Sequence, residues 1–166
     1  MSDETEWLVR RGRNLGTAKD DSVASSSRAS VVADAAFSHA NRRIALSGFF
    51  GATAVLAGAF GAHALRGHLM PEMLAVWNTG AQYQLAHAVA LLALALASRS
   101  EPRVKIPFLL LASGTALFSG SLYALALSGT RWLGAITPVG GVLMVAGWMA
   151  LAWVFRNGAT GAKPPA

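Results

Sequence analysis

Four stretches of this chain are uncharged and apolar over the length of a membrane-spanning helix: residues 44–65, 77–97, 106–127 and 132–155. A helix needs about 20 mostly apolar residues to cross the hydrocarbon core of a bilayer. Inside that core, only helices and closed barrels satisfy every backbone hydrogen bond. Short breaks that carry charge, glycine or proline separate the stretches. We therefore predict an all-α integral membrane protein, a four-helix bundle that runs up and down through the membrane.

The composition agrees with this prediction. Only 13% of the residues are charged, whereas an ordinary soluble domain has about 25%. The chain contains no cysteine, which excludes disulfides, thiolate nucleophiles and zinc–sulfur sites. The formal net charge of +6 does not indicate nucleic-acid binding, because no recognised binding motif accompanies it.

The basic residues flank the spans unevenly. With four spans, the two tails and the middle loop share one side of the membrane, and that side holds Arg42, Arg43, Arg99, Arg103, Lys105, Arg156 and Lys163. The other side holds only Arg66 and Arg131. Lysine and arginine accumulate in cytoplasmic segments of membrane proteins. Both termini are therefore expected in the cytoplasm.

The two ends of the chain differ in composition from the spans. Residues 1–41 contain most of the acidic residues and the serine-rich run SVASSSRAS, and they are predicted to be a mostly disordered cytoplasmic tail. Within this region, residues 31–43 are expected to form a helical lead-in at the membrane surface. Residues 42–157 are expected to form the membrane domain, followed by a flexible tail over residues 158–166.

Small residues recur at helical spacing in two of the spans, where they predict close helix packing. They are Gly51, Ala54, Gly58 and Gly61 in the first span, and Gly140, Gly141 and Gly147 in the fourth. Small side chains let two helix backbones approach closely, and van der Waals contact then favours association in lipid. The partner helix can belong to the same chain or to another subunit.

Polar residues concentrate in the predicted outer half of the spans. The candidate cluster comprises His63, Asn78, Gln82, Tyr83, Gln84, His87, Ser119, Ser121, Tyr123 and Thr137. Polar groups at membrane depth need partners inside the protein, so we expect these side chains to converge on a shared network. Pro138 is expected to interrupt the fourth span and to leave a carbonyl that Thr137 or another helix must satisfy.

Four segments carry a resemblance to a known family. In order along the chain they are GAFGAHALRGHL, WNTGAQYQLAHAVALL, GTALFSGSLYALALSG and LGAITPVGGVLMVAGWMAL. Together they resemble the YgdD/YwdK-type family of small bacterial inner-membrane proteins, a family of unknown function with a eukaryotic relative. The resemblance covers residues 44–155 and implies a four-helix, multi-pass protein of the inner (cytoplasmic) membrane. It supplies no catalytic residue and no cofactor.

Two hypotheses about function fit the sequence best. In the first, the chain is a structural or accessory membrane protein that contacts the lipid bilayer and packs against another membrane protein or a second copy of itself. The polar cluster then provides hydrogen bonds between helices. In the alternative, the cluster binds a small solute, a lipid or a proton, because ionisable groups inside a membrane mark functional sites.

Two further classes are disfavoured. A bis-histidine haem or metal site would use His63 and His87, but these residues lie at different predicted depths, so no cofactor and no metal ligand is assigned. The spans contain no aspartate or glutamate, and the sequence shows no Ser–His–acid set and no phosphate-binding loop. No catalytic residue is therefore predicted, and the chain is not expected to be an enzyme.

Overall fold

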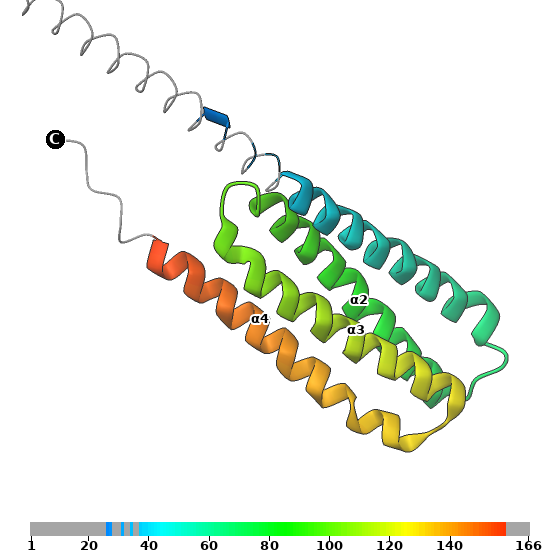
Figure 1. Cartoon of the computed structure of the whole chain (residues 1–166). Helices are drawn as coiled ribbons and strands as arrows, with labels where there is room; N and C mark the ends of the chain where they lie inside the picture. Colours follow the sequence, from blue (N-terminus) through cyan, green and yellow to red (C-terminus); the bar gives the residue numbers. More distant parts are fainter. Residues whose placement is uncertain (1–25, 28–30, 32–33, 35–36, 159–166) are drawn as a thin grey trace, which may run out of the picture. The chain divides into compact units, whose positions relative to one another are not determined.

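The computed structural model of the chain describes residues 26–27, 31, 34 and 37–158. Within these residues, four helices are long and apolar enough to cross a membrane: Phe37–Leu65, Pro71–Ala97, Pro102–Ser128 and Arg131–Arg156 (Figure 1). The described residues contain no strand. The contacts divide the chain after His39, and the packing below concerns the unit that begins at Ala40. Most of the predicted N-terminal tail and residues 159–166 lie outside the described residues.

The second helix, α2 (Pro71–Ala97), begins six residues before the predicted start at Trp77. Met70 is extended, Pro71 occupies the first helical position and Glu72 lies in the first turn. Proline has no N–H to lose at that position, and an acidic side chain favours the positive end of the helix dipole. These start signals lie in the charged break, so hydropathy alone placed the start too late.

The fourth span is divided into two pieces, and this corrects the prediction about Pro138. A short 3₁₀ turn, η3 (Arg131–Ala135), precedes α4, which runs over Thr137–Gly158. Pro138 is thus the second residue of α4 rather than an interior residue. The first N–H groups of a helix have no intrahelical acceptor, so proline removes no hydrogen bond at this place.

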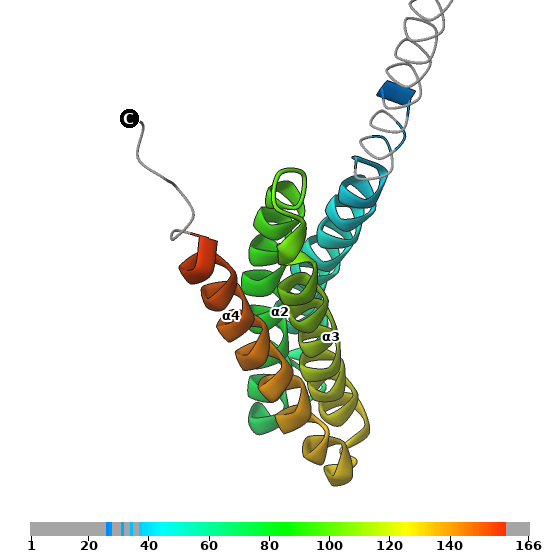
Figure 2. The same ribbon diagram turned by 60° about the vertical axis from the view of Figure 1, so that its left-hand side comes forward.

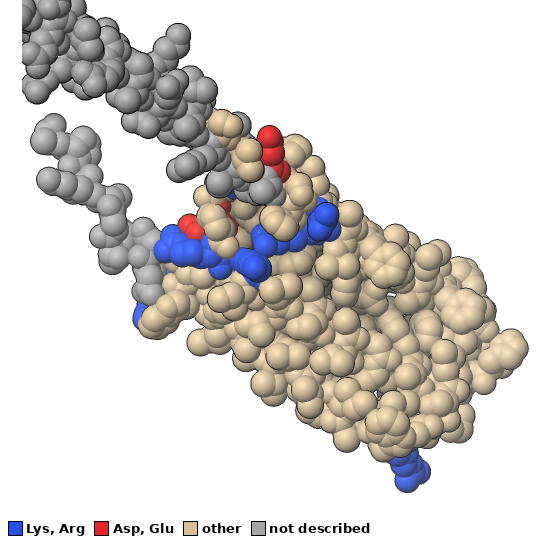
Figure 3. Space-filling model, in the orientation of Figure 1, with Lys and Arg blue, Asp and Glu red and all other residues tan. Residues whose placement is uncertain are grey.

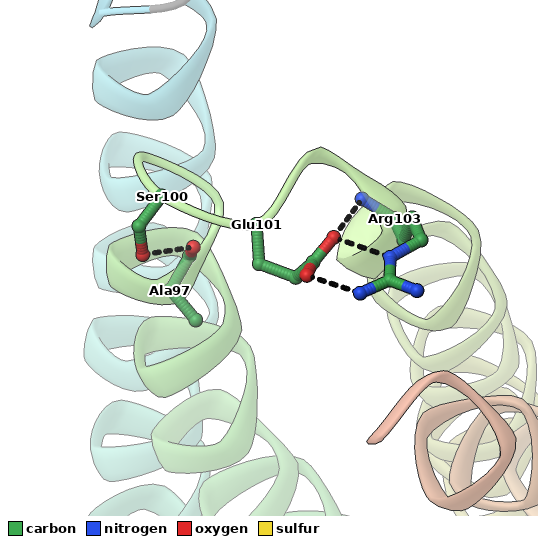
Figure 4. Close-up of polar contacts among 4 residues, drawn as sticks. All are labelled: Ala97, Ser100, Glu101 and Arg103. Atoms are coloured by element: carbon green, nitrogen blue, oxygen red, sulfur yellow. Dashed lines mark hydrogen bonds and ion pairs between the residues drawn. The ribbon is translucent and has the colours of Figure 1, made fainter. Parts of the chain in front are cut away.

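The third helix, α3 (Lys105–Ser128), has defined features at both ends. A short 3₁₀ turn, η2 (Pro102–Val104), leads into it, and the Glu101 carboxylate accepts hydrogen bonds from the Arg103 backbone N–H and guanidinium at 2.7–3.0 Å (Figure 4). These bonds, the side-chain bonds above all, lower the pKa of Glu101 to about 2. At the other end Gly129, with φ 66°, donates its N–H to the Leu125 carbonyl. Glycine adopts this left-handed conformation without steric cost.

The four helices are buried to different extents. Of the most apolar 18-residue window in each, 44% is buried in α2 and 39% in the α3 span, but only 17% in each of the first and fourth spans. The ribbon views show α2 and α3 in the middle, with α4 against α3 (Figure 2). The largest apolar core joins α2, α3 and α4 through Leu91, Phe108, Leu111 and Met144. Ile44 and Phe50 of the first helix pack against this core.

Charged side chains lie at the ends of the helices and leave an uncharged band between them (Figure 3). At one end, Arg99 donates a hydrogen bond to the Asn41 amide oxygen, and the Arg43 guanidinium lies 5.6 Å from the centre of the Phe108 ring. Arg156 lies in the last turn of α4. The band between the ends has the composition that a hydrocarbon environment requires.

Candidate functional site

Gln84 joins three helices at the midpoint of α2. Its Nε2 donates to the Phe50 carbonyl (3.0 Å) and to the Thr53 hydroxyl (2.7 Å) on the first helix. Its Oε1 accepts a hydrogen bond from the Tyr123 hydroxyl of α3 at 3.0 Å. Only 8% of Gln84 is exposed. Both N–H groups and the carbonyl of this amide therefore bond to neighbouring helices.

A second connection between the first helix and α2 lies near the break at Leu65. The Trp77 indole N–H donates to the Ala57 carbonyl at 2.8 Å, and the Trp77 ring lies 4.5 Å from the ring of Tyr123. Four residues after Ala57 the first helix widens into a π-helical turn, η1 (Gly61–Leu65). The Trp77 bond therefore joins α2 to the last regular turn of the first helix before this π-helical turn.

Two serines of α3 bond to the helices on either side. The Ser119 hydroxyl donates to the Gly80 carbonyl of α2 at 2.9 Å, and Ser119 is 2% exposed. The Ser121 and Thr137 hydroxyls lie 2.8 Å apart and connect α3 with the start of α4. Candidate residues on three spans thus form direct bonds between helices, and Gln84 extends the network to the first helix.

His87 lies apart from this network, on the side of α2 that faces α4. The Trp148 indole N–H donates to His87 Nε2 at 3.3 Å, and His87 Nδ1 lies 2.8 Å from the Tyr83 carbonyl. An indole nitrogen can only donate, so Nε2 is an acceptor. Nδ1 is then the nitrogen that donates, and it donates to the Tyr83 backbone carbonyl.

Several concave regions adjoin these residues, and two of them are lined by Gln84 and by His87, respectively. The first, here called the polar pocket, has a volume of about 270 Å³ and is lined by Phe49, Phe50, Thr53, Gln84, Ala116, Ser119, Gly120 and Tyr123. The second, the aromatic groove, has a volume of about 550 Å³ and is lined by Tyr83, His87, Phe118, Pro138, Gly141, Val142, Met144, Val145 and Trp148. The predicted cluster therefore does not line a single site: Gln84, Ser119 and Tyr123 line the polar pocket, and Tyr83 and His87 line the aromatic groove.

Besides Tyr83 and His87, three candidate residues lie outside the bonded network. His63 and Gln82 are exposed, and His63 lies in the π-helical turn at the end of its helix. Asn78 lies close to Gly61, because a Cβ atom on that glycine would come within 2.8 Å of the Asn78 Oδ1. His87 lines the aromatic groove, and His63 lines neither the groove nor the polar pocket.

The predicted small-residue positions fall into two groups. Among the glycines, Gly61, Gly140 and Gly147 lie so close to a neighbouring helix that an added Cβ would come within 3.0 Å of it. Gly51 makes ordinary contact with Ala88, and Ala54 is 2% exposed. Gly58 and Gly141 have open space where a Cβ would lie.

The sequence reasoning missed four residues that matter here: Thr53, Trp77, Gly114 and Trp148. An added Cβ on Gly114 would lie 2.8 Å from the backbone nitrogen of Met144, so this glycine lies opposite Gly140 where α3 and α4 approach most closely. The spacing of Gly140 and Gly147 was a usable signal for that face. Trp148, by contrast, has no sequence neighbour that indicates its bond to His87.

Comparison with known proteins identifies the family. A family model described as "Protein of unknown function (DUF423)" matches residues 57–141. The UPF0382 inner membrane protein YgdD of Escherichia coli is 46% identical over 108 residues, which cover 63% of this chain and 79% of YgdD. The UPF0382 membrane protein YwdK of Bacillus subtilis is 44% identical over 101 residues, or 59% of this chain and 82% of YwdK.

A UPF0382 membrane protein of Staphylococcus epidermidis is 46% identical over 99 residues, which cover 59% of this chain and 81% of the relative. No solved structure matches the chain. The matched residues include Trp77, Gln84, His87, Ser119 and Tyr123, whereas Phe50 and Thr53 of the first helix and Trp148 of α4 lie outside the matched region. With its four apolar helices, the chain belongs to the DUF423 (UPF0382) family of membrane proteins, whose function is unknown.

Proposed function

We propose that this protein is a non-enzymatic structural or accessory component of the inner (cytoplasmic) membrane, which associates with another membrane protein or a second copy of itself. One observation carries the proposal. Among the described residues, every buried side-chain nitrogen and oxygen atom has a hydrogen-bond partner. The polar network is therefore used to hold the helices together. The relative YgdD is named an inner membrane protein, which supports the location.

The proposal includes an up-and-down bundle with both termini in the cytoplasm. Pairs of contacting residues support the alternating direction, because Gln84 bonds to Phe50 whereas Trp77, earlier in α2, bonds to Ala57, later in the first helix. The α3–α4 contacts follow the same reversed order. The greater basic charge around the tails and the middle loop supports the cytoplasmic side.

Cysteine labelling tests this topology, because the chain has no cysteine of its own. Ser100→Cys lies in the middle loop and Gly67→Cys in the first loop, and both positions are exposed. In cells whose outer envelope is permeabilised while the inner membrane stays intact, a membrane-impermeant maleimide is expected to label Gly67→Cys at once. Ser100→Cys should react only after the inner membrane is permeabilised. The reverse pattern would contradict the proposed orientation.

Site-specific photo-crosslinking tests the accessory role in native membranes. Leu56 on the first helix and Met149 on α4 are matched positions, 68% and 67% exposed. With a benzophenone amino acid at each position, we expect a discrete protein adduct from at least one of the two outer helices. The adduct partner should also copurify with the unmodified chain in fixed stoichiometry in mild detergent. Adducts with lipid alone, together with a monomeric, partner-free chain, would refute the proposal.

A further inference from the structure

The aromatic groove contains a hydrogen-bond donor for which the described residues provide no acceptor. Tyr83 is 46% exposed, and its ring lies 4.7 Å from the Phe118 ring and 6.1 Å from the His87 ring. No residue in the described part of the chain accepts a hydrogen bond from its hydroxyl. The other polar side chains of the groove, His87 and Trp148, bond to each other, and His87 also bonds to the Tyr83 backbone carbonyl.

Tyr83 lies far from both ends of its helix. Tyr83 lies next to the midpoint of α2, a helix of 27 residues, so its Cα is about 18 Å or more from either helix end. Half the hydrocarbon core is about 15 Å thick. A polar group that no water reaches needs a partner, and the partner has to be soluble in the bilayer core.

The lining of the groove restricts the chemistry of that partner. None of the nine lining residues is a lysine, arginine, aspartate or glutamate, so the groove provides no permanently charged side chain for a phosphate or another charged headgroup. Its volume of about 550 Å³ is within the usual range of small-molecule sites, about 300–1,000 Å³. Tyr83, Phe118 and Trp148 offer aromatic surface for a planar ring, while Val142 and Val145 are 67% and 64% exposed and border the groove with apolar surface.

We infer that the aromatic groove binds a membrane-dissolved quinone. The planar ring would lie against the aromatic side chains, one carbonyl oxygen would accept a hydrogen bond from the Tyr83 hydroxyl, and the apolar tail would follow α4 towards the lipid. Ester carbonyls of phospholipids lie at the membrane interface, too far from Tyr83 to make the same bond. The inference concerns binding only and stands independently of the accessory role proposed above.

Quinone titration of the full chain in quinone-free lipid nanodiscs tests the inference. Decylubiquinone quenches tryptophan fluorescence, and Trp148 borders the groove. We expect saturable quenching of the wild type. In Trp148→Phe, the saturable part of the fluorescence quenching should become smaller. Binding of the quinone itself, measured without fluorescence, should persist. Quenching that rises without saturation would show simple partition into lipid and would overturn the inference.

Two pairs of variants locate the site. Gly141 and Gly120 both have open space beyond the Cα, but Gly141 lines the aromatic groove and Gly120 the polar pocket. Gly141→Leu should abolish binding with the fold intact, and Gly120→Leu should leave binding unchanged. Tyr83→Phe removes the unused hydroxyl and should weaken binding about five- to tenfold without a change in thermal stability. Tyr123→Phe, which alters the only other tyrosine, should retain binding.

A competitor without carbonyl groups separates quinone recognition from simple filling by an apolar molecule. Decylbenzene has a similar ring and tail but accepts no hydrogen bond from Tyr83. It should displace decylubiquinone only at concentrations about five- to tenfold higher. Equal displacement by the two compounds, or unchanged affinity in Tyr83→Phe, would overturn the assignment of a carbonyl-bearing ligand.

Discussion

Replacement of Gln84 by leucine is expected to lower the free energy of unfolding by about 2 kcal/mol, because three hydrogen bonds between helices are lost and each contributes about 0.6 kcal/mol on average in membrane proteins. Leucine has a similar size, so packing changes little. The Tyr123 hydroxyl loses its acceptor, whereas the Phe50 carbonyl and the Thr53 hydroxyl keep bonds within their own helix. Thermal or denaturant unfolding in detergent, followed by circular dichroism, measures the loss.

Gln82 provides a matched control on the same helix. It is two residues away and exposed, and no described residue bonds to its side chain. Gln82→Leu should therefore leave the unfolding midpoint unchanged or raise it slightly. If both substitutions lowered the unfolding midpoint equally, the removal of any glutamine side chain from α2 would be the cause. That result would contradict the role given to the Gln84 bonds.

Gly140→Ala is expected to destabilise the protein by about 2–3 kcal/mol through overpacking. The new Cβ would lie 2.5 Å from the backbone nitrogen of Phe118 and 2.8 Å from the Gly114 carbonyl oxygen. Both neighbours are backbone atoms of a helix and cannot rotate away, so α4 has to move off α3. A lower unfolding midpoint and a smaller monodisperse fraction on size-exclusion chromatography should report the change.

The adjacent glycine is the control for this substitution. Gly141→Ala adds the same methyl group where nothing lies within 4 Å, and alanine favours helix over glycine by about 1 kcal/mol. Its stability should equal or exceed that of the wild type. If Gly140→Ala were as stable as Gly141→Ala, the close approach of α3 and α4 at Gly114 and Gly140 would be refuted.

The four spans could be predicted from the sequence because hydropathy over about 20 residues is a cumulative signal. The residues at which the helices begin were harder to predict. Pro71 and Glu72 begin α2 inside a polar break, and Pro138 looked like an interruption because hydropathy does not show the 3₁₀ turn before it. Local backbone geometry, rather than the apolar pattern, decides these boundaries.

For the candidate site, residue type and depth predicted which polar side chains need partners but not which partners they find. Gln82 and Gln84 are chemically identical in the sequence, and only helix rotation directs one inward and the other outward. The bond between His87 and Trp148 depends on the packing of α4 against α3, which hydropathy does not encode. Separation of the cluster into a polar pocket and an aromatic groove follows from the same packing.

The unequal burial of the four helices has a consequence for biogenesis. Helices enter a membrane in chain order, and their lateral association follows insertion. The first helix inserts before Trp77 and Gln84 are available to it, so it must remain in lipid unaided until α2 arrives. The hairpin of α2 and α3 contains most of the buried residues of the four spans. It then acts as the template to which the first helix, made earlier, and α4, made later, both bind.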